Sequence, residues 1–264
     1  MKATAKQLIE FAHNTRVVVS LLIFFWSATS LNPRAVGQEQ PKAGSSKSET
    51  RTTDEPKGVT KYLGRRVAQP MGYMHMNWLS RPERIQEENP QEMLDQLNLK
   101  DALVVCDLGS GDGYHTIQIA PRIGPSGKVI AVDIQPQMLQ ELSRRLAEKK
   151  IDNVETVLGE LWDPKLPTSE VDLILMVDVY HEFSHPVQML AALRKALKPN
   201  GLIALVEFRA EDPTVQIRAE HKMTKVQILK EYKANGFKVA KEYDRLPWQH
   251  LMFMQRDETW SEKP

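Results

Sequence analysis

The sequence predicts an α/β fold in which a mostly parallel sheet is covered by helices on both faces. Apolar, β-branched runs alternate with stretches of helical length from residue 103 onward, as expected for a doubly wound parallel sheet. Two strand-like runs near the C-terminus break this alternation, because the turn between them is too short for a crossover helix. The fold class is therefore α/β with an antiparallel addition at one edge.

The parallel strands are expected at residues 103–108, 129–134, 154–158, 171–180 and 202–208, and the helices between them at 114–123, 136–149 and 186–197. A short amphipathic helix is expected at 91–97. Thr224 and Gln227 fit a capping box that opens a helix ending near Ala234, with Gly236 as its stop. The runs 238–243 and 250–255 are expected to pair antiparallel at one edge of the sheet.

The N-terminal part of the chain differs in kind from the rest. Lys2, Lys6 and Arg16 precede the apolar run 17–26, and small residues follow at 35–37. This run is short for a permanent span, which needs about 20 residues, so we interpret residues 1–37 as a secretory signal peptide, with an uncleaved membrane anchor as the alternative. The protein is then exported or membrane-associated, and membrane contact is expected only through this segment.

Three further regions follow from the change in composition. Residues 38–61 are polar, with almost no large apolar side chains, and are expected to form a flexible linker because they cannot bury enough surface to offset ordering entropy. Residues 62–97 are expected to form an N-terminal lid and helix. Residues 98–264 carry the α/β pattern and form the main domain.

Charge and cysteine content exclude several classes of protein. The 35 basic and 34 acidic residues nearly balance, so nothing indicates a nucleic-acid partner. Cys106 is the single cysteine, which excludes an internal disulfide framework and a thiolate zinc cluster. Because Cys106 lies in an apolar run, we expect it to be a buried hydrophobic side chain.

The strongest local signal is VVCDLGSGDGYHTIQIA, residues 104–120. A buried strand ends at Asp107, and a loop with Gly109, Gly111 and Gly113 leads into a helix, so the backbone can turn sharply and approach a ligand closely. The spacing GxGxG differs from the GxGxxG of dinucleotide-binding proteins. The next strand ends in Asp133, where a carboxylate can accept hydrogen bonds from both ribose hydroxyls. Together these elements predict a nucleoside-type cofactor.

These motifs resemble those of the class I S-adenosylmethionine-dependent methyltransferases. DLGSGDG matches the family's first motif, AVDIQPQML its second, and LKPNGLIALVEF its strand-five region. The resemblance implies a Rossmann-like sheet of seven strands, parallel except for one. It also implies S-adenosyl-L-methionine as cofactor. Asp107 and the loop residues Gly109, Ser110, Gly111 and Gly113 would hold the methionine part.

The remaining cofactor residues are carried over from the same resemblance. Asp133 would hold the ribose and Ile134 would lie against the adenine. The family commonly has Gly-Asp after its third strand, whereas this chain has Gly159-Glu160, so the longer Glu160 would have to reach the adenine amino group. Asp178 corresponds to the acid of the family's fourth motif.

The stretch HEFSH, residues 181–185, fits the HExxH pattern of zinc metalloproteases. That chemistry needs both histidines on one face of a continuous helix. Here the motif follows an apolar strand, and Pro186 disfavours helical geometry at His185, so we expect a loop in which Ser184 or His185 caps the next helix. We therefore expect no zinc-peptidase activity and no metal ion.

This loop is expected at the carboxyl end of a central strand, where the ligand crevice opens. By the resemblance it faces the methyl acceptor, with Tyr180 and His181 as candidate contacts and Glu182 as a possible base. Glu182 bonding only to loop amides remains an alternative. Our hypothesis is that His181 assists a protic oxygen, nitrogen or acidic carbon acceptor, since a base matters only where a proton is lost.

Two other segments are candidates for the acceptor side. The lid stretch 71–84 offers Tyr73, Trp78 and Arg81, although its methionines and His75 also suit copper. The stretch 206–224 follows the fifth strand, and it offers three further candidates: Glu207, Arg209 and His221.

The leading hypothesis is a small-molecule methyltransferase similar to the group that includes quinone-biosynthesis and arsenite methyltransferases. Arsenite is disfavoured because that chemistry uses several cysteines. An Asn-Pro-Pro-Tyr motif, typical of nucleic-acid or protein methylation, is absent from the sequence. The alternative is an exported, non-catalytic cofactor- or metal-binding protein, because export would separate the enzyme from a cofactor made in the cytoplasm.

Overall fold

A computed structural model describes residues 55–261 of the 264-residue chain. The predicted signal peptide, residues 1–37, and most of the predicted linker lie outside the described residues. No helix within residues 55–261 is long and apolar enough to cross a bilayer.

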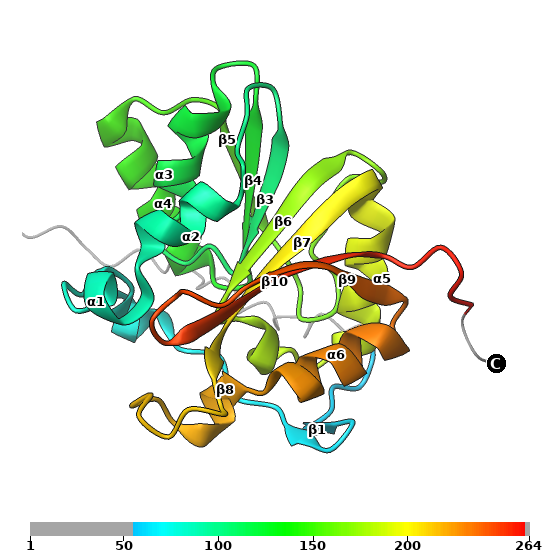
Figure 1. Ribbon diagram of the computed structural model, residues 1–264. Coiled ribbons are helices and arrows are strands. Elements are labelled where there is room, and N and C mark those ends of the chain that lie inside the picture. Colours follow the sequence, from blue (N-terminus) through cyan, green and yellow to red (C-terminus); the bar gives the residue numbers. More distant parts are fainter. Residues whose placement is uncertain (1–54, 262–264) are drawn as a thin grey trace, which may run out of the picture. The chain divides into compact units, whose positions relative to one another are not determined.

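The centre of the fold is a sheet in the order β5-β4-β3-β6-β7-β10-β9, with the two-residue β8 attached to β7 (Figure 1). All neighbouring strands are parallel except β10, which is antiparallel to both β7 and β9. The expected mostly parallel sheet with one antiparallel strand is therefore confirmed. The strands are β3 (Val104–Leu108), β4 (Lys128–Asp133), β5 (Val154–Leu158), β6 (Val171–Val177), β7 (Leu197–Arg209), β8 (Lys222–Met223), β9 (Phe237–Tyr243) and β10 (Gln249–Arg256).

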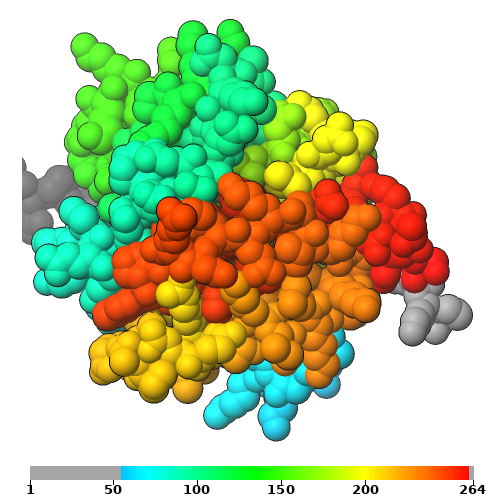
Figure 2. Space-filling view, viewed as in Figure 1, coloured from blue at the N-terminus to red at the C-terminus, as the bar shows by residue number. Residues whose placement is uncertain are grey.

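Helices cover both faces of this sheet, because neighbouring residues of each buried strand point to opposite faces. On one face, Cys106 and Ile174 pack with α5 and α6; on the other, Val105 and Leu175 pack with α2 and α3. Helix α4 packs on β4 through Leu142. The helices are α1 (Arg84–Glu88), α2 (Pro90–Gln96), α3 (Thr116–Ile119), α4 (Pro136–Lys149), α5 (Pro186–Ala196) and α6 (Lys225–Ala234). Figure 2 shows α6 and the β9–β10 pair, coloured orange to red, across the face in view.

Several element boundaries differ from the prediction for local reasons. The helix expected at 114–123 is split into α3 and the 3₁₀ turn η2 (Ala120–Ile123), because Pro121 has no amide hydrogen to donate. The strand expected at 171–180 ends at Val177, and Asp178 takes a left-handed conformation with φ of 54°. Thr224 is confirmed as the N-cap, because its side chain accepts a hydrogen bond from the Gln227 amide, 3.1 Å away. The full capping box does not form, since the Gln227 side chain donates to Leu63 and Glu231 instead.

The segment before α1 contains a hairpin of β1 (Lys61–Tyr62) and β2 (Arg65–Arg66), followed by the 3₁₀ segment η1 (Tyr73–Ser80). The last residues of the predicted linker contact the main domain: the Val59 amide donates to Ser184, and the Pro56 carbonyl accepts from His185 Nε2. The chain is therefore anchored from Pro56 onward, before the boundary that composition indicated.

Candidate active site

Four sequence-predicted residues lie together at the carboxyl ends of the parallel strands, because strands that run in one direction end on the same side of the sheet. Asp107 lies at the end of β3 and Asp133 at the end of β4, while Gly159 follows β5 and Asp178 follows β6. The Gly159 amide donates to the Asp133 carbonyl at 3.0 Å, which ties two of these strand ends together.

The glycine loop is shaped by backbone conformations that favour glycine. Gly109, Gly111 and Gly113 have φ of 75°, 53° and 85°, in the left-handed region that other residues rarely adopt. A Cβ at Gly109 would lie 2.5 Å from Val179 Cγ2, and one at Gly111 would lie 2.6 Å from Leu79 Cδ1. The sequence uses glycine here because both the conformation and the lack of space require it.

Two buried carboxylates flank this loop. Asp133 accepts hydrogen bonds from the Gly111 amide at 2.9 Å and the Gln135 amide at 2.8 Å, and burial raises its pKa. Asp107 accepts from the Thr116 hydroxyl at 2.5 Å, and burial raises its pKa to about 6. Asp133 therefore fixes the loop to β4, and Asp107 joins β3 to α3, the two elements that the loop connects.

Buried polar atoms without partners indicate that this crevice is suited to a polar ligand. Within the described residues, Ser110 Oγ and Asp178 Oδ1 are buried and make no hydrogen bond, an arrangement that costs free energy unless a partner is supplied. The other Asp178 oxygen accepts from Gln249 at 2.7 Å. Burial and the nearby Glu88 raise the pKa of Asp178 well above its usual range.

The residues expected at the adenine are less enclosed. Ile134 is half-buried beside Asp133, and Glu160 forms an ion pair with Lys165 at 2.7 Å. The Trp162 ring meets the His185 ring edge-on, 5.8 Å between centroids.

The N-terminal segment lies over the glycine loop. Besides the contact of Leu79 with Gly111, the Gln135 side chain accepts from the Tyr73 amide and donates to the Met71 carbonyl, at 2.8 and 2.9 Å. Residues 71–80 therefore cover the predicted cofactor crevice.

A second tie between this segment and the loop was missed by sequence reasoning. The Arg84 guanidinium lies 3.0 Å from His115 Nε2 and 4.3 Å from the centre of the Tyr114 ring. Sequence spacing carries no signal for this contact, because α1 and the loop are far apart along the chain.

Three acceptor-side candidates converge next to this crevice. In the 3₁₀ turn η3 (Tyr180–Glu182), His181 Nδ1 lies 2.6 Å from Glu207 Oε2, and its backbone amide donates to Glu207 Oε1 at 3.1 Å. His181 Nε2 lies 3.0 Å from His221 Nδ1 and 3.9 Å from Glu182 Oε1. We call His181, Glu182 and His221 the triad; their donor atoms lie within 4.8 Å of one another.

The triad is buried or half-buried, and this changes its protonation. Burial opposes the charged form of His181, but the Glu207 carboxylate outweighs it, so the pKa of His181 is raised. Burial raises the pKa of Glu182 to about 7. Burial and the neighbouring His181 lower the pKa of His221.

Tyr180, the third residue expected at the acceptor, is placed apart from the triad. Its fully buried hydroxyl donates to Glu231 Oε2 at 2.8 Å, and Glu231 also pairs with Arg65 at 2.9 Å. Consecutive side chains of a 3₁₀ turn point about a third of a turn apart, so Tyr180 and His181 face different surroundings. The structure thus gives Tyr180 a packing role beneath α6.

The geometry contradicts a zinc peptidase. His185 Nε2 bonds to the Pro56 carbonyl at 2.7 Å and its Nδ1 lies 3.0 Å from Ser184, whereas His181 bonds to Glu207. The two histidines of HEFSH therefore do not converge. His185 occupies the N-cap position of α5, but its side chain makes no capping bond.

The remaining candidates lie away from the triad. Tyr73 and Trp78 are exposed, and the Arg81 guanidinium stacks over Trp78 and pairs with Glu87 and Glu88. Arg209 donates to the carbonyls of Asp244 and Pro247 and holds the turn before β10.

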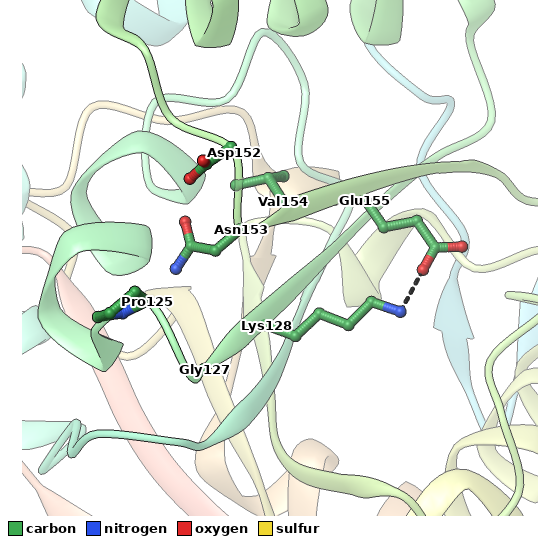
Figure 3. A pocket seen from close by; sticks show the side chains of 7 residues that line it. All are labelled: Pro125, Gly127, Lys128, Asp152, Asn153, Val154 and Glu155. Atoms are coloured by element: carbon green, nitrogen blue, oxygen red, sulfur yellow. Dashed lines mark ion pairs between the residues drawn. The ribbon is translucent and has the colours of Figure 1, made fainter.

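A surface hollow at the opposite edge of the sheet is a poor candidate for the active site (Figure 3). It lies at the amino ends of β4 and β5, beside the ion pair of Lys128 and Glu155. Ligands of doubly wound sheets bind beyond the carboxyl ends of the strands, where Asp107 and Asp133 lie.

Comparison with known proteins agrees with this geometry. Residues 99–258, more than half of the chain, match the family described as "Methyltransferase domain". The chain therefore belongs to the methyltransferase-domain family, and S-adenosylmethionine is the cofactor that this membership implies. The structure of a SAM-dependent methyltransferase from Aquifex aeolicus has a TM-score of 0.66 and 23% identity, covering 70% of this chain and 98% of that one; it shows the fold.

The curated relatives are partial matches. An arsenite methyltransferase of Halobacterium salinarum is 30% identical over 38% of this chain and 26% of its own length. A ubiquinone/menaquinone biosynthesis C-methyltransferase of Ectopseudomonas mendocina is 29% identical over 39% of this chain and 41% of its own length. The chain spans less than half the length of these two relatives.

Proposed function

We propose that this protein is an S-adenosylmethionine-dependent methyltransferase that acts on a small molecule. The observation that carries the proposal is the cluster at the carboxyl ends of β3 and β4, where Asp133 accepts a hydrogen bond from Gly111 of the glycine loop and Asp107 accepts one from Thr116 of α3. Family membership supports it. When bound, S-adenosylmethionine supplies a methyl group activated by a sulfonium sulfur.

Each part of the crevice has a proposed role toward the cofactor. Asp107 and the loop glycines would hold the methionine part, whose ammonium group suits a carboxylate. Asp133 would bind the ribose hydroxyls, with Ile134 against the adenine. The unpartnered Ser110 and Asp178 oxygens offer further acceptors.

The triad is proposed as the acceptor side of the site. Glu207 fixes His181, and the Met71 amide donates to Glu182 at 3.3 Å, so both groups are held in place beneath the N-terminal segment. Much of the rate of methyl transfer can come from alignment of donor and acceptor. A protic acceptor must also release a proton, and the triad offers nitrogen and carboxylate atoms to promote that step.

The balanced overall charge argues against a nucleic-acid acceptor, and the printed activities of the two relatives support a small-molecule acceptor. Arsenite itself is not proposed, because the single cysteine, Cys106, is fully buried in the core.

Calorimetric titration with S-adenosylmethionine tests the proposal. We expect wild-type binding, and at least about tenfold weaker binding in Asp133→Ala, since hydrogen bonds to a charged group are worth about 1.5–3 kcal/mol each. Asp152→Ala is the matched control, because Asp152 is an exposed aspartate at the opposite edge of the sheet. Absence of wild-type binding, or equal effects of the two substitutions in folded protein, would contradict the proposal.

We also propose, from the sequence alone, that residues 1–37 direct export of the rest of the chain. In that exported part, residues 62–97 form the lid and helix and residues 98–264 the methyltransferase domain. Fractionation of cells that express the full chain, with the mass of the product, tests this. A full-mass chain found only in the cytoplasm would contradict it.

A further inference from the structure

The triad has the composition of a metal site. Two imidazoles and one carboxylate are ligands that zinc and similar divalent transition metals accept. Each offers one donor atom, and the three atoms lie within 4.8 Å of one another: His181 Nε2, His221 Nδ1 and Glu182 Oε1. The cluster is sheltered, with side-chain exposures of 2%, 26% and 15% respectively.

The separations between the donor atoms match the size of such an ion. The three distances are 3.0 Å between the histidine nitrogens, and 3.9 and 4.0 Å from these nitrogens to the carboxylate oxygen. The point in the plane of the three atoms that is equidistant from them lies about 2.1 Å from each, which is the length of a Zn–N or Zn–O bond. The spacing of the three donor atoms therefore admits an ion once the proton between the two histidine nitrogens is displaced.

Glu207 supplies the outer contact that metal-binding histidines usually have. Its fully buried carboxylate accepts hydrogen bonds from both the backbone amide and the Nδ1 atom of His181. A proton on Nδ1 leaves the lone pair of the neutral ring on Nε2, pointing away from Glu207. A carboxylate behind a histidine in this way fixes the ring and strengthens it as a ligand.

We propose that His181, Glu182 and His221 bind one divalent transition-metal ion of the zinc class, with Glu207 as a positioning residue for His181. Three protein donors leave at least one coordination position open. On the proposed function, this position would take an oxygen of the methyl acceptor, and the ion, instead of the lone pairs that hold it, would then promote loss of a hydroxyl proton. Acceptors with a hydroxyl or carboxylate oxygen are therefore the favoured class.

The proposal differs from the zinc-peptidase pattern that the sequence contains. HEFSH contributes its first histidine and its glutamate, while the second histidine ligand is His221 from the 3₁₀ turn η4 (Ala219–His221). The expectation of no metal ion rested on His185, which bonds to Pro56 instead.

The test is calorimetric titration of untagged, EDTA-treated and dialysed full-length protein with Zn²⁺, without cofactor or acceptor. We expect one equivalent to bind with micromolar or tighter affinity. Mg²⁺, which prefers all-oxygen octahedral sites, should not bind at the same concentrations. Co²⁺ offers an independent readout, because ligation by nitrogen gives visible absorption bands.

Variants assign the binding to the triad. His221→Ala and Glu182→Gln should each weaken Zn²⁺ binding at least tenfold, and Glu207→Gln should weaken it about 10- to 100-fold through His181. His75→Ala is the matched control, because His75 is exposed in the Met-rich lid, and it should bind as the wild type does. Thermal melting of each variant shows whether it is folded.

Three results would overturn the proposal: folded wild type that binds no Zn²⁺, binding that survives His221→Ala, or binding that His75→Ala abolishes. The first result would mean that His181 and His221 form a hydrogen bond with each other and bind no ion. Because the titration contains no S-adenosylmethionine, its failure is separate from failure of the proposed function, which the cofactor titration reports.

Discussion

Gly113, where the glycine loop leads into α3, offers a sharp steric prediction. Its φ is 85°, and a Cβ added there would overlap Leu142 Cδ1, which belongs to the fully buried Leu142 of α4. A left-handed conformation costs a non-glycine residue about 1–2 kcal/mol, and overpacking a core costs about 1–3 kcal/mol. We therefore expect Gly113→Ala to lower the free energy of unfolding by about 2–5 kcal/mol.

The matched control is Gly72→Ala, the same substitution at a glycine with φ of −67° and no atom within 4 Å of the added Cβ. There alanine should change stability by less than about 1 kcal/mol. Thermal and urea unfolding measure both. A loss of about 2 kcal/mol lowers the Tm of a domain of this size by at least about 4 °C. If the two variants melt at the same temperature, the account of the glycine loop is wrong.

Three further predictions concern Tyr180, its partner and Asp107. Tyr180→Phe should lower the free energy of unfolding by about 1–3 kcal/mol, because its hydrogen bond to Glu231 is lost. The affinity for S-adenosylmethionine should stay unchanged, and weaker cofactor binding would argue against a packing role. Glu231→Ala should cost about 3–5 kcal/mol in urea unfolding, because it leaves the Arg65 charge buried and unpaired; a loss below that of Tyr180→Phe would contradict this. The pKa of Asp107 is raised to about 6, so its carboxylate becomes protonated below that pH. Cofactor affinity measured by calorimetry should therefore fall about tenfold between pH 7 and pH 5. An unchanged affinity would exclude Asp107 as the partner of the cofactor's ammonium group.

The fold and the relative positions of the candidate cofactor residues were predictable because their signals are local. The central strands β3, β4 and β6 carry largely apolar runs, and the carboxylates at or next to the ends of β3 and β4, Asp107 and Asp133, are read directly from the sequence. The GxGxG spacing likewise indicates a loop with left-handed backbone conformations, which glycine adopts without steric cost. Strand order then places these ends side by side without further information.

The acceptor side was predictable only in part, because its geometry is made by contacts between distant segments. Glu207 and His221 were candidates, but no sequence pattern indicates that they meet at the two ring nitrogens of His181. Tyr180 was expected there because, by the family resemblance, its loop faces the acceptor. The 3₁₀ turn directs its side chain to Glu231 instead. The contact of Leu79 with Gly111 was not predictable either, because it joins two segments that are far apart along the chain.

The most direct test of the central claim is a crystal structure of the protein grown with S-adenosylhomocysteine, the product form of the cofactor. We predict the ligand beside Gly109–Gly113, with both ribose hydroxyls on the Asp133 carboxylate and the sulfur facing the end of β6. Ligand bound at the hollow beside Lys128 and Glu155, or crystals that hold no ligand at saturating concentration, would contradict the account.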